Sequence, residues 1–149
     1  MSNDRIGHRD FLKSLDQIGQ QAVARFEPTH LVVALDPINF EKPHTDNLEG
    51  VSTVMKSTPP ALTGEARPTK GYPAMTATIL NLPVPVLSYA NWFSYTMDEL
   101  VSVHRETYRA IRTTRALFPH HRLRFVGDAG LDDRKIFHQV TLVQGEFII

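Results

Sequence analysis

The stretch His30-Leu31-Val32-Val33-Ala34-Leu35-Asp36-Pro37 decides the fold. Five consecutive apolar residues rich in β-branched side chains, bounded by Pro28 and Pro37, predict a strand that is buried on both faces. The apolar run ends in one carboxylate, Asp36. Because open α/β folds place their sites at the carboxyl ends of parallel strands, Asp36 is the first candidate functional residue.

A second stretch, Leu123-Arg124-Phe125-Val126-Gly127-Asp128, is also a short strand pattern that ends in an aspartate. If it lies parallel to the first strand and beside it, both carboxylates emerge at one edge of the sheet. Paired carboxylates suit Mg²⁺ or Mn²⁺, which prefer oxygen ligands, and such ions promote phosphoryl transfer. Taken singly, an aspartate at a strand end is also a common turn residue or helix cap.

Composition limits the alternatives. The length predicts one domain, residues 1–149, and 42% hydrophobic residues fit a globular chain. No segment has the pattern of a signal peptide or a membrane span, so we expect a cytoplasmic location and no membrane partner. Without cysteine, a metal must be held by oxygen or imidazole. A net charge of zero is unlike that of an isolated nucleic-acid-binding module.

The flanking sequence predicts the remaining elements. Within residues 1–27, an amphipathic pattern predicts an N-terminal helix. Residues 41–73 are interrupted by proline and glycine and predict an irregular excursion, with a short helical turn over Leu48–Met55. Residues 74–82 and 86–93 predict an antiparallel hairpin beside the strand to Asp36, with Trp92 covering apolar surface.

The C-terminal part reads as helix, strand, helix, strand. Thr96 and Glu99 match a capping box, and a short helix follows Asp132 or Asp133. The chain ends inside an apolar run, so we expect it to be C-terminally truncated. Short connections and right-handed crossovers then favour an α/β, ribonuclease H-like mixed sheet of about five strands, in the order 3-2-1-4-5, with flanking helices.

Several of these motifs, in this order, resemble the DDE transposases of bacterial insertion sequences, specifically the insertion sequence four group. The matching segments are Leu-Asp-Pro-Ile-Asn-Phe-Glu-Lys-Pro at 35–43, Lys-Gly-Tyr at 70–72, the Arg-Phe-Val-Gly-Asp-Ala-Gly-Leu-Asp-Asp-Arg-Lys run at 124–135, and Gly-Glu-Phe-Ile-Ile at 145–149. The resemblance implies that Asp36 and Asp128 are catalytic residues and ligands of Mg²⁺ or Mn²⁺. It places the third acid, a glutamate, on a helix expected beyond Ile149. It also implies transposon-end and target DNA as partners of the full-length protein, and a homodimer.

Two functions from different classes therefore stay open. The chain is a fragment of a transposase catalytic core, or it is a non-catalytic remnant that at most binds DNA or a partner chain. With two carboxylates and no net charge, we do not expect this chain alone to cut or join DNA at a useful rate. A weaker alternative, an aspartate-nucleophile phosphatase, requires an acid two positions after Asp36, where this chain has Ile38.

Other polar residues have both a functional and a plain interpretation. Lys42 follows the first aspartate closely enough for a phosphate contact, or it is simply solvated. Arg105, Arg109 and Arg112 share a helix face that is either solvated or bound to DNA phosphates. Three further sets have less promising patterns as ligands. They are Asp132 and Asp133, which are expected to be helix caps, Glu146, which precedes an apolar strand, and His120-His121, which lack a third nitrogen ligand for zinc.

Overall fold

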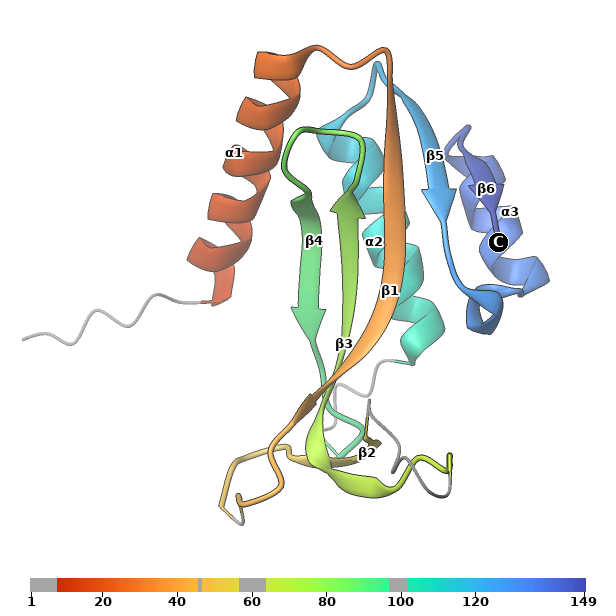
Figure 1. Ribbon diagram of the computed structural model, residues 1–149. Coiled ribbons are helices and arrows are strands. Elements are labelled where there is room, and N and C mark those ends of the chain that lie inside the picture. The colour runs from red at the N-terminus through yellow and green to blue at the C-terminus, as the bar shows by residue number, and fades with distance from the viewer. Residues whose placement is uncertain (1–7, 46, 57–63, 97–101) are drawn as a thin grey trace, which may run out of the picture.

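The computed structural model describes residues 8–45, 47–56, 64–96 and 102–149. They form a mixed sheet with helices packed on it (Figure 1). The strands are β1 (His30–Glu41), β2 (Ser52–Met55), β3 (Pro68–Ile79), β4 (Val86–Trp92), β5 (Arg122–Val126) and β6 (Glu146–Ile148). The helices are α1 (His8–Phe26), α2 (Val103–Leu117), the 3₁₀ turn η1 (Ala129–Leu131) and α3 (Arg134–Leu142).

Strand β1 is the centre of the sheet, as its apolar run predicts. It pairs antiparallel with β3 from Val33 to Glu41 and parallel with β5 from His30 to Ala34. Odd-numbered side chains from 31 to 35 are buried, whereas the even-numbered ones are partly or fully exposed. The first half of β1 therefore lies between two strands, and the second half has a described partner only on the β3 side.

The strand order confirms the predicted architecture. Strand β4 pairs with β3 and β6 pairs parallel with β5, so the core strands run β4-β3-β1-β5-β6. Numbered along the chain without β2, this order is 3-2-1-4-5, that of a ribonuclease H-like sheet. The hairpin formed by β3 and β4 lies beside β1 as expected, with Ala74 opposite Trp92.

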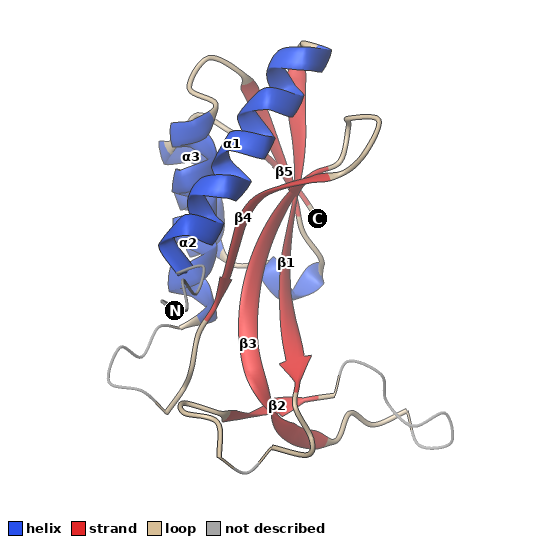
Figure 2. Ribbon diagram, turned by 90° about the vertical axis from the view of Figure 1, so that its left-hand side faces the viewer, coloured by secondary structure: helices blue, strands red, loops and turns tan. Residues whose placement is uncertain are grey.

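All three α-helices lie on one side of the sheet (Figure 2). Helix α1 packs on β4, α2 crosses β3, β4 and β1, and α3 packs on α2 and β6. The core between them contains Leu31, Val33, Met75, Ile111 and Phe125, which are fully buried. Within the described ranges, no helix has the length and apolar character to cross a bilayer. The opposite face of the sheet carries the even-numbered side chains of β1, including Asp36.

The excursion is more ordered than its composition predicts. The helical turn expected over Leu48–Met55 is wrong, because residues 52–55 form strand β2, which pairs antiparallel with the start of β3. Strand β1 also continues through Pro37 to Glu41. Proline is tolerated there because β5 no longer pairs with this part of β1. Together, residues 37–41, 52–55 and 68–73 form an extension of the sheet, which we call the ribbon.

The predicted capping box at Thr96 is also wrong. Helix α2 has Ser102 as its N-cap, and the Ser102 hydroxyl accepts a hydrogen bond of 3.2 Å from the Arg105 N–H. The Thr96 hydroxyl instead lies 2.9 Å from that of Ser94, and Glu99 lies outside the described residues. A serine three residues before Arg105 satisfies the orphan N–H groups of the first turn equally well.

Candidate functional site

Asp36 and Asp128 emerge at equivalent positions of two neighbouring parallel strands. The last pair of the β1–β5 ladder joins Ala34 to Val126, and each aspartate lies two residues further along the chain, Asp36 within β1 and Asp128 just beyond β5. The backbone of Asp128 is still extended, with φ −80° and ψ 174°. Because side chains alternate along a strand, both aspartates follow the even-numbered row that faces away from the helices. This row lies on the face of the sheet that none of the described α-helices covers, which we call the uncovered face.

The environment of Asp36 disfavours its ionised form. Burial raises the pKa of the Asp36 carboxyl first, and the negative charge of Asp128 raises it further. Thr76 lies opposite Asp36 on β3, and its hydroxyl donates a 3.2 Å hydrogen bond to the Asp36 carbonyl oxygen. A like charge nearby is unfavourable unless a cation lies between the two carboxylates. The pair therefore has the electrostatic property expected of a cation site.

Asp128 also has the capping role that its position in the sequence allows. Its Oδ1 accepts a 3.0 Å hydrogen bond from the Gly130 N–H, and it is the N-cap of η1. A Cβ at position 130 would lie 3.1 Å from this oxygen, which explains a glycine there. The cap fixes the orientation of the carboxylate and uses one lone pair of Oδ1. The second oxygen, Oδ2, makes no hydrogen bond with any described residue.

The two carboxylates supply hard oxygen donors, which fit Mg²⁺ or Mn²⁺ by chemistry. Within the described ranges, however, no group of three or more His, Asp or Glu side chains is close enough to hold a metal ion. The described residues therefore present at most a two-carboxylate site. A cation bound there would complete its shell with water or with substrate oxygens.

Lys42 lies away from the carboxylate pair. It follows the end of β1, and its backbone N–H donates to the carbonyl of Lys70 at 2.8 Å. Six residues of extended strand separate it from Asp36, about 20 Å at the usual rise per residue. Instead, Lys42 lines a groove with Phe40, Leu48, Tyr72 and Trp92. Trp92 covers apolar surface in part, because its ring packs against Phe11 with centroids 5.9 Å apart while the residue stays 46% exposed.

The other polar candidates have structural partners. Asp133 caps α3, accepting a 2.6 Å hydrogen bond from the Lys135 N–H, which lowers the pKa of its carboxyl most. Arg109 forms an ion pair with Glu106, and Arg112 donates to Gln139 at 2.7 Å. The capping interpretation of Asp133 is thus confirmed.

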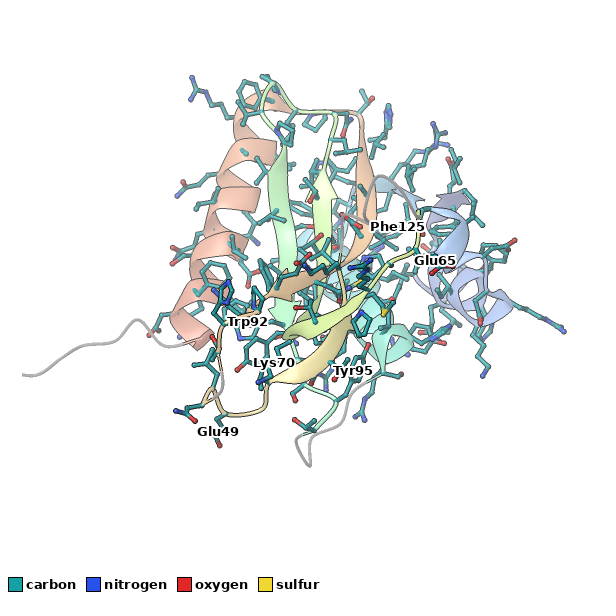
Figure 3. The ribbon with its side chains drawn as sticks, turned by 60° about the horizontal axis from the view of Figure 1, so that its bottom comes forward. Glu49, Glu65, Lys70, Trp92, Tyr95 and Phe125 are labelled. Carbon is teal, nitrogen blue, oxygen red and sulfur yellow. The ribbon has the colours of Figure 1, made fainter. Side chains whose placement is uncertain are left out.

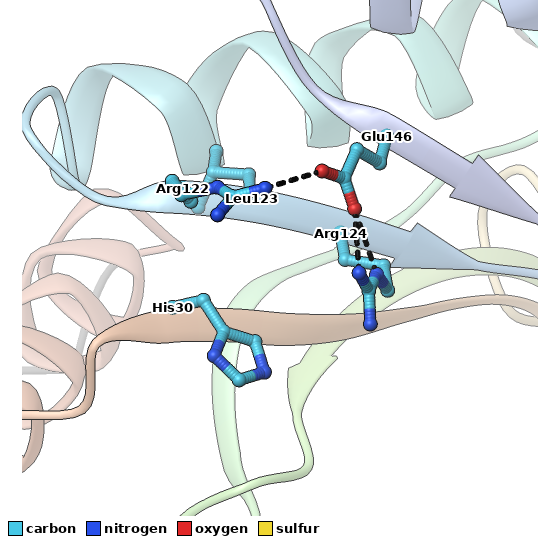
Figure 4. A pocket seen from close by; sticks show the side chains of 5 residues that line it. All are labelled: His30, Arg122, Leu123, Arg124 and Glu146. Carbon is cyan, nitrogen blue, oxygen red and sulfur yellow. Dashed lines mark hydrogen bonds and ion pairs between the residues drawn. The ribbon is translucent and has the colours of Figure 1, made fainter.

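Glu146 bridges two arginines at the opposite end of the β1–β5 ladder. It lies 2.9 Å from Arg122 and 2.7 Å from Arg124, beside His30 and Leu123 in a pocket of about 200 Å³ (Figure 4). Hydrogen bonds from Arg124 and then Arg122 lower the pKa of Glu146. Both arginines thus share Glu146 as a carboxylate partner.

Sequence reasoning missed a buried carboxylate, Glu106, in the middle of α2. Its side chain is 0% exposed and accepts hydrogen bonds from the Tyr89 hydroxyl at 2.6 Å, Asn91 Nδ2 at 2.8 Å and Arg109 Nη1 at 2.6 Å. Burial, and then the hydrogen bond to Glu106, raise the pKa of the Tyr89 hydroxyl. The available signal was that Glu106 occupies a position of the apolar stripe between Val103 and Ala110.

No protein-family model and no curated protein sequence matches this chain. Among solved structures, it is similar to the catalytic domain of Mos1 mariner transposase, with 15% identity and a TM-score of 0.44 over 100% of this chain and 64% of that one. The same domain with Raltegravir and Mg has 15% identity and a TM-score of 0.46, over 97% of this chain and 63% of that one. The Mos1 transposase paired-end complex with left transposon end has 13% identity and a TM-score of 0.46, over 99% of this chain and 44% of that one. The chain thus spans less than two thirds of each.

Proposed function

We propose that this chain is a piece of the catalytic core of a DDE DNA transposase, of the insertion sequence four group that its motifs resemble, in which Asp36 and Asp128 bind a divalent cation. The observation that carries the proposal is the placement of both aspartates two residues beyond the Ala34–Val126 pair. Two acids that follow adjacent parallel strands can together bind a divalent cation of the kind that promotes phosphoryl transfer.

The chain's own residues have distinct tasks in this proposal. Asp128, oriented by the Gly130 N–H, presents a fixed oxygen, and Asp36 supplies the second negative charge. A bound Mg²⁺ or Mn²⁺ supplies Lewis-acid stabilisation of charge on phosphodiester oxygens. The uncovered face beside these residues leaves room for a DNA strand. Transposon-end and target DNA are the proposed partners, and a homodimer is the proposed assembly.

A second candidate is a non-catalytic remnant. It is favoured by the finding that no three metal-ligating side chains gather in the described part of the chain. In this case Asp128 serves chiefly as the cap of η1, and the chain at most binds DNA or a partner chain.

Metal binding tests the proposal directly. We would titrate the chain with Mn²⁺ and follow free Mn²⁺ by electron paramagnetic resonance, comparing Asp36→Asn, Asp128→Asn and the control Asp132→Asn, an exposed acid nearby. One site that is lost in the first two variants and kept in the control is expected. Equal binding by all four proteins would refute the metal site.

Activity separates the two candidates. Nicking and strand-transfer assays on transposon-end DNA, with Mg²⁺ and with Mn²⁺, use the same four proteins. Activity that requires both aspartates supports a competent core. Metal binding without activity supports a piece that lacks part of the catalytic machinery, in agreement with the two-carboxylate count.

A further inference from the structure

The ribbon carries a groove that the proposed chemistry does not use. It has a volume of about 480 Å³ and is lined by Phe40, Lys42, Leu48, Tyr72 and Trp92. We call it the aromatic groove. Trp92 and the chain around Glu49 lie on the same side of the molecule in Figure 3, so the groove opens at the surface between the sheet and this loop.

Strand register places the three rings on one face. Phe40 and Tyr72 are directly opposite each other on β1 and β3, and Trp92 is opposite Ala74, two residues after Tyr72. Directly opposed and alternate residues share a sheet face, so the rings form one row across three strands. The same register puts Asp36 opposite Thr76 and Thr76 opposite Ala90, on that same face.

The walls of the groove are held in place before any ligand binds. The Tyr72 hydroxyl donates a 2.6 Å hydrogen bond to the Glu49 carbonyl, which fixes the loop that carries Leu48. The Trp92 ring packs against Phe11 of α1 with centroids 5.9 Å apart. Rings held in this way lose little conformational freedom when a flat ligand stacks on them.

The groove nevertheless leaves a large apolar area in water. Phe40 and Trp92 are each 46% exposed, and Leu48 is 44% exposed. At the rim, the Lys42 ammonium forms no ion pair with the described residues and is exposed. Aromatic faces beside a cation are the combination that binds single-stranded nucleic acid, because bases stack on the rings and a phosphate pairs with the cation.

The distance to the carboxylates is short enough for one strand to span. Phe40 is four residues from Asp36 along β1, about 13 Å at the usual rise. That length corresponds to about four nucleotides at the stacked spacing of 3.4 Å. About four nucleotides of a strand whose phosphodiester lies at Asp36 and Asp128 are therefore long enough to reach the groove.

We propose that the aromatic groove binds unpaired nucleotides of the DNA strand that approaches Asp36 and Asp128, with bases stacked on Phe40 and Trp92 and a phosphate at Lys42. The choice of DNA as ligand rests on the proposed function. A neutral chain offers little long-range attraction, so stacking contributes most of the affinity and the salt dependence is weak. Duplex DNA, whose bases are already stacked, does not fit this mode of binding.

Trp92 is the only tryptophan, so its fluorescence reports on the groove directly. We would titrate the chain with a thymidine oligonucleotide and with a duplex of equal length, in EDTA so that no metal site contributes. Saturable quenching by the single strand, and at least about tenfold weaker binding of the duplex, are expected. Phe40→Ala should weaken single-strand binding about tenfold or more.

Matched variants make the test specific. Phe26→Ala removes a phenylalanine that is 45% exposed at the end of α1, and it should bind like the parent chain. Lys42→Gln should lower the slope of log affinity against log salt by about 0.7. Asp36→Asn with Asp128→Asn should leave binding in EDTA intact, so failure of the metal site and failure of the groove are separate results.

Two outcomes would overturn the inference. The first is equal quenching by duplex and single strand, or equal affinity of the parent and Phe40→Ala when circular dichroism shows both folded. The second is a Trp92 signal that changes with protein concentration but not with DNA, which would indicate that the groove binds a second copy of the chain.

Discussion

Asp36 and Asp128 occupy equivalent positions at the end of the parallel β1–β5 ladder. Each lies two residues past the Ala34–Val126 pair, the last pair of that ladder. The negative charge of Asp128 adds to the effect of burial in raising the pKa of Asp36. The Asp36 carboxyl thus responds to the charge of Asp128, although the two residues are 92 positions apart in the sequence. Its titration is the first property to measure.

Replacement of Asp128 by asparagine should lower the pKa of Asp36, because it removes the like charge. The pKa should stay above the ordinary value of 3.8, because burial is the larger cause of its increase. Carboxyl ¹³C chemical shifts across a pH titration measure both values. An unchanged pKa of Asp36 in Asp128→Asn would show that the two carboxylates do not interact. Asp132→Asn serves as the control.

Replacement of Glu106 by alanine should destabilise the fold by about 3–5 kcal/mol, the usual effect of breaking a buried charged pair. The donors Tyr89, Asn91 and Arg109 would lose their common acceptor. Tyr89→Phe removes a single donor and should cost about 1–2 kcal/mol. Urea unfolding measures the free energies. Glu49→Ala, at an exposed position, should change stability by less than about 0.5 kcal/mol, and a similar small effect for Glu106→Ala would contradict the prediction.

Arg115→Lys should lower the free energy of unfolding by about 1.5–3 kcal/mol, measured by thermal or urea unfolding, although it keeps the positive charge. The guanidinium donates to backbone carbonyls of Val143 and His121 at 2.8 Å each, and so joins the ends of α2 and α3. Burial lowers the pKa of Arg115. A lysine cannot reach these carbonyls in parallel. Arg112→Lys, which alters an exposed contact, is the matched control and should stay within about 0.5 kcal/mol.

The Glu146 ion pairs should stabilise the fold in a pH-dependent manner. Because Arg124 and Arg122 lower the pKa of Glu146 below 4.5 in the folded state, the stabilisation is present above pH 4.5 and is lost as the pH falls through the folded pKa. Glu146→Gln should therefore melt at a lower temperature than the parent near neutral pH and at the same temperature in acid. The difference should shrink at about 1 M salt, since the groups are exposed. A pH-independent difference would contradict the prediction.

The sequence predicted the elements whose periodicity is strong and local. The strands that lead to Asp36 and Asp128, the N-terminal helix and the β3–β4 hairpin are all present, although β1 continues beyond Asp36 to Glu41. Their strand order followed from connection rules that need no side-chain detail. Asp36 and Asp128 were chosen as candidate site residues because each aspartate ends an apolar run.

The missed features depend on distant partners. The four residues of β2 have no period of their own and become a strand only by pairing with residues 68–71. Pro37 normally marks a strand end, but it is accommodated where β5 has stopped. The burial of Glu106 was missed because its donors Tyr89 and Asn91 lie on β4, a different element from α2, which carries Glu106. Such effects are set by tertiary contacts rather than by local pattern.

The two halves of β1 should differ in local stability. From His30 to Ala34 the strand pairs with β5 and its odd-numbered side chains are buried, whereas from Pro37 to Glu41 its only ladder among the described strands is with β3. Backbone amides in the first half should exchange with solvent only on global unfolding. Those in the second half should exchange through local opening, which has a smaller free-energy cost. Asp36 lies at the boundary between these two cooperative units. Ordering of the ribbon is thereby coupled to the carboxylate through a single continuous backbone.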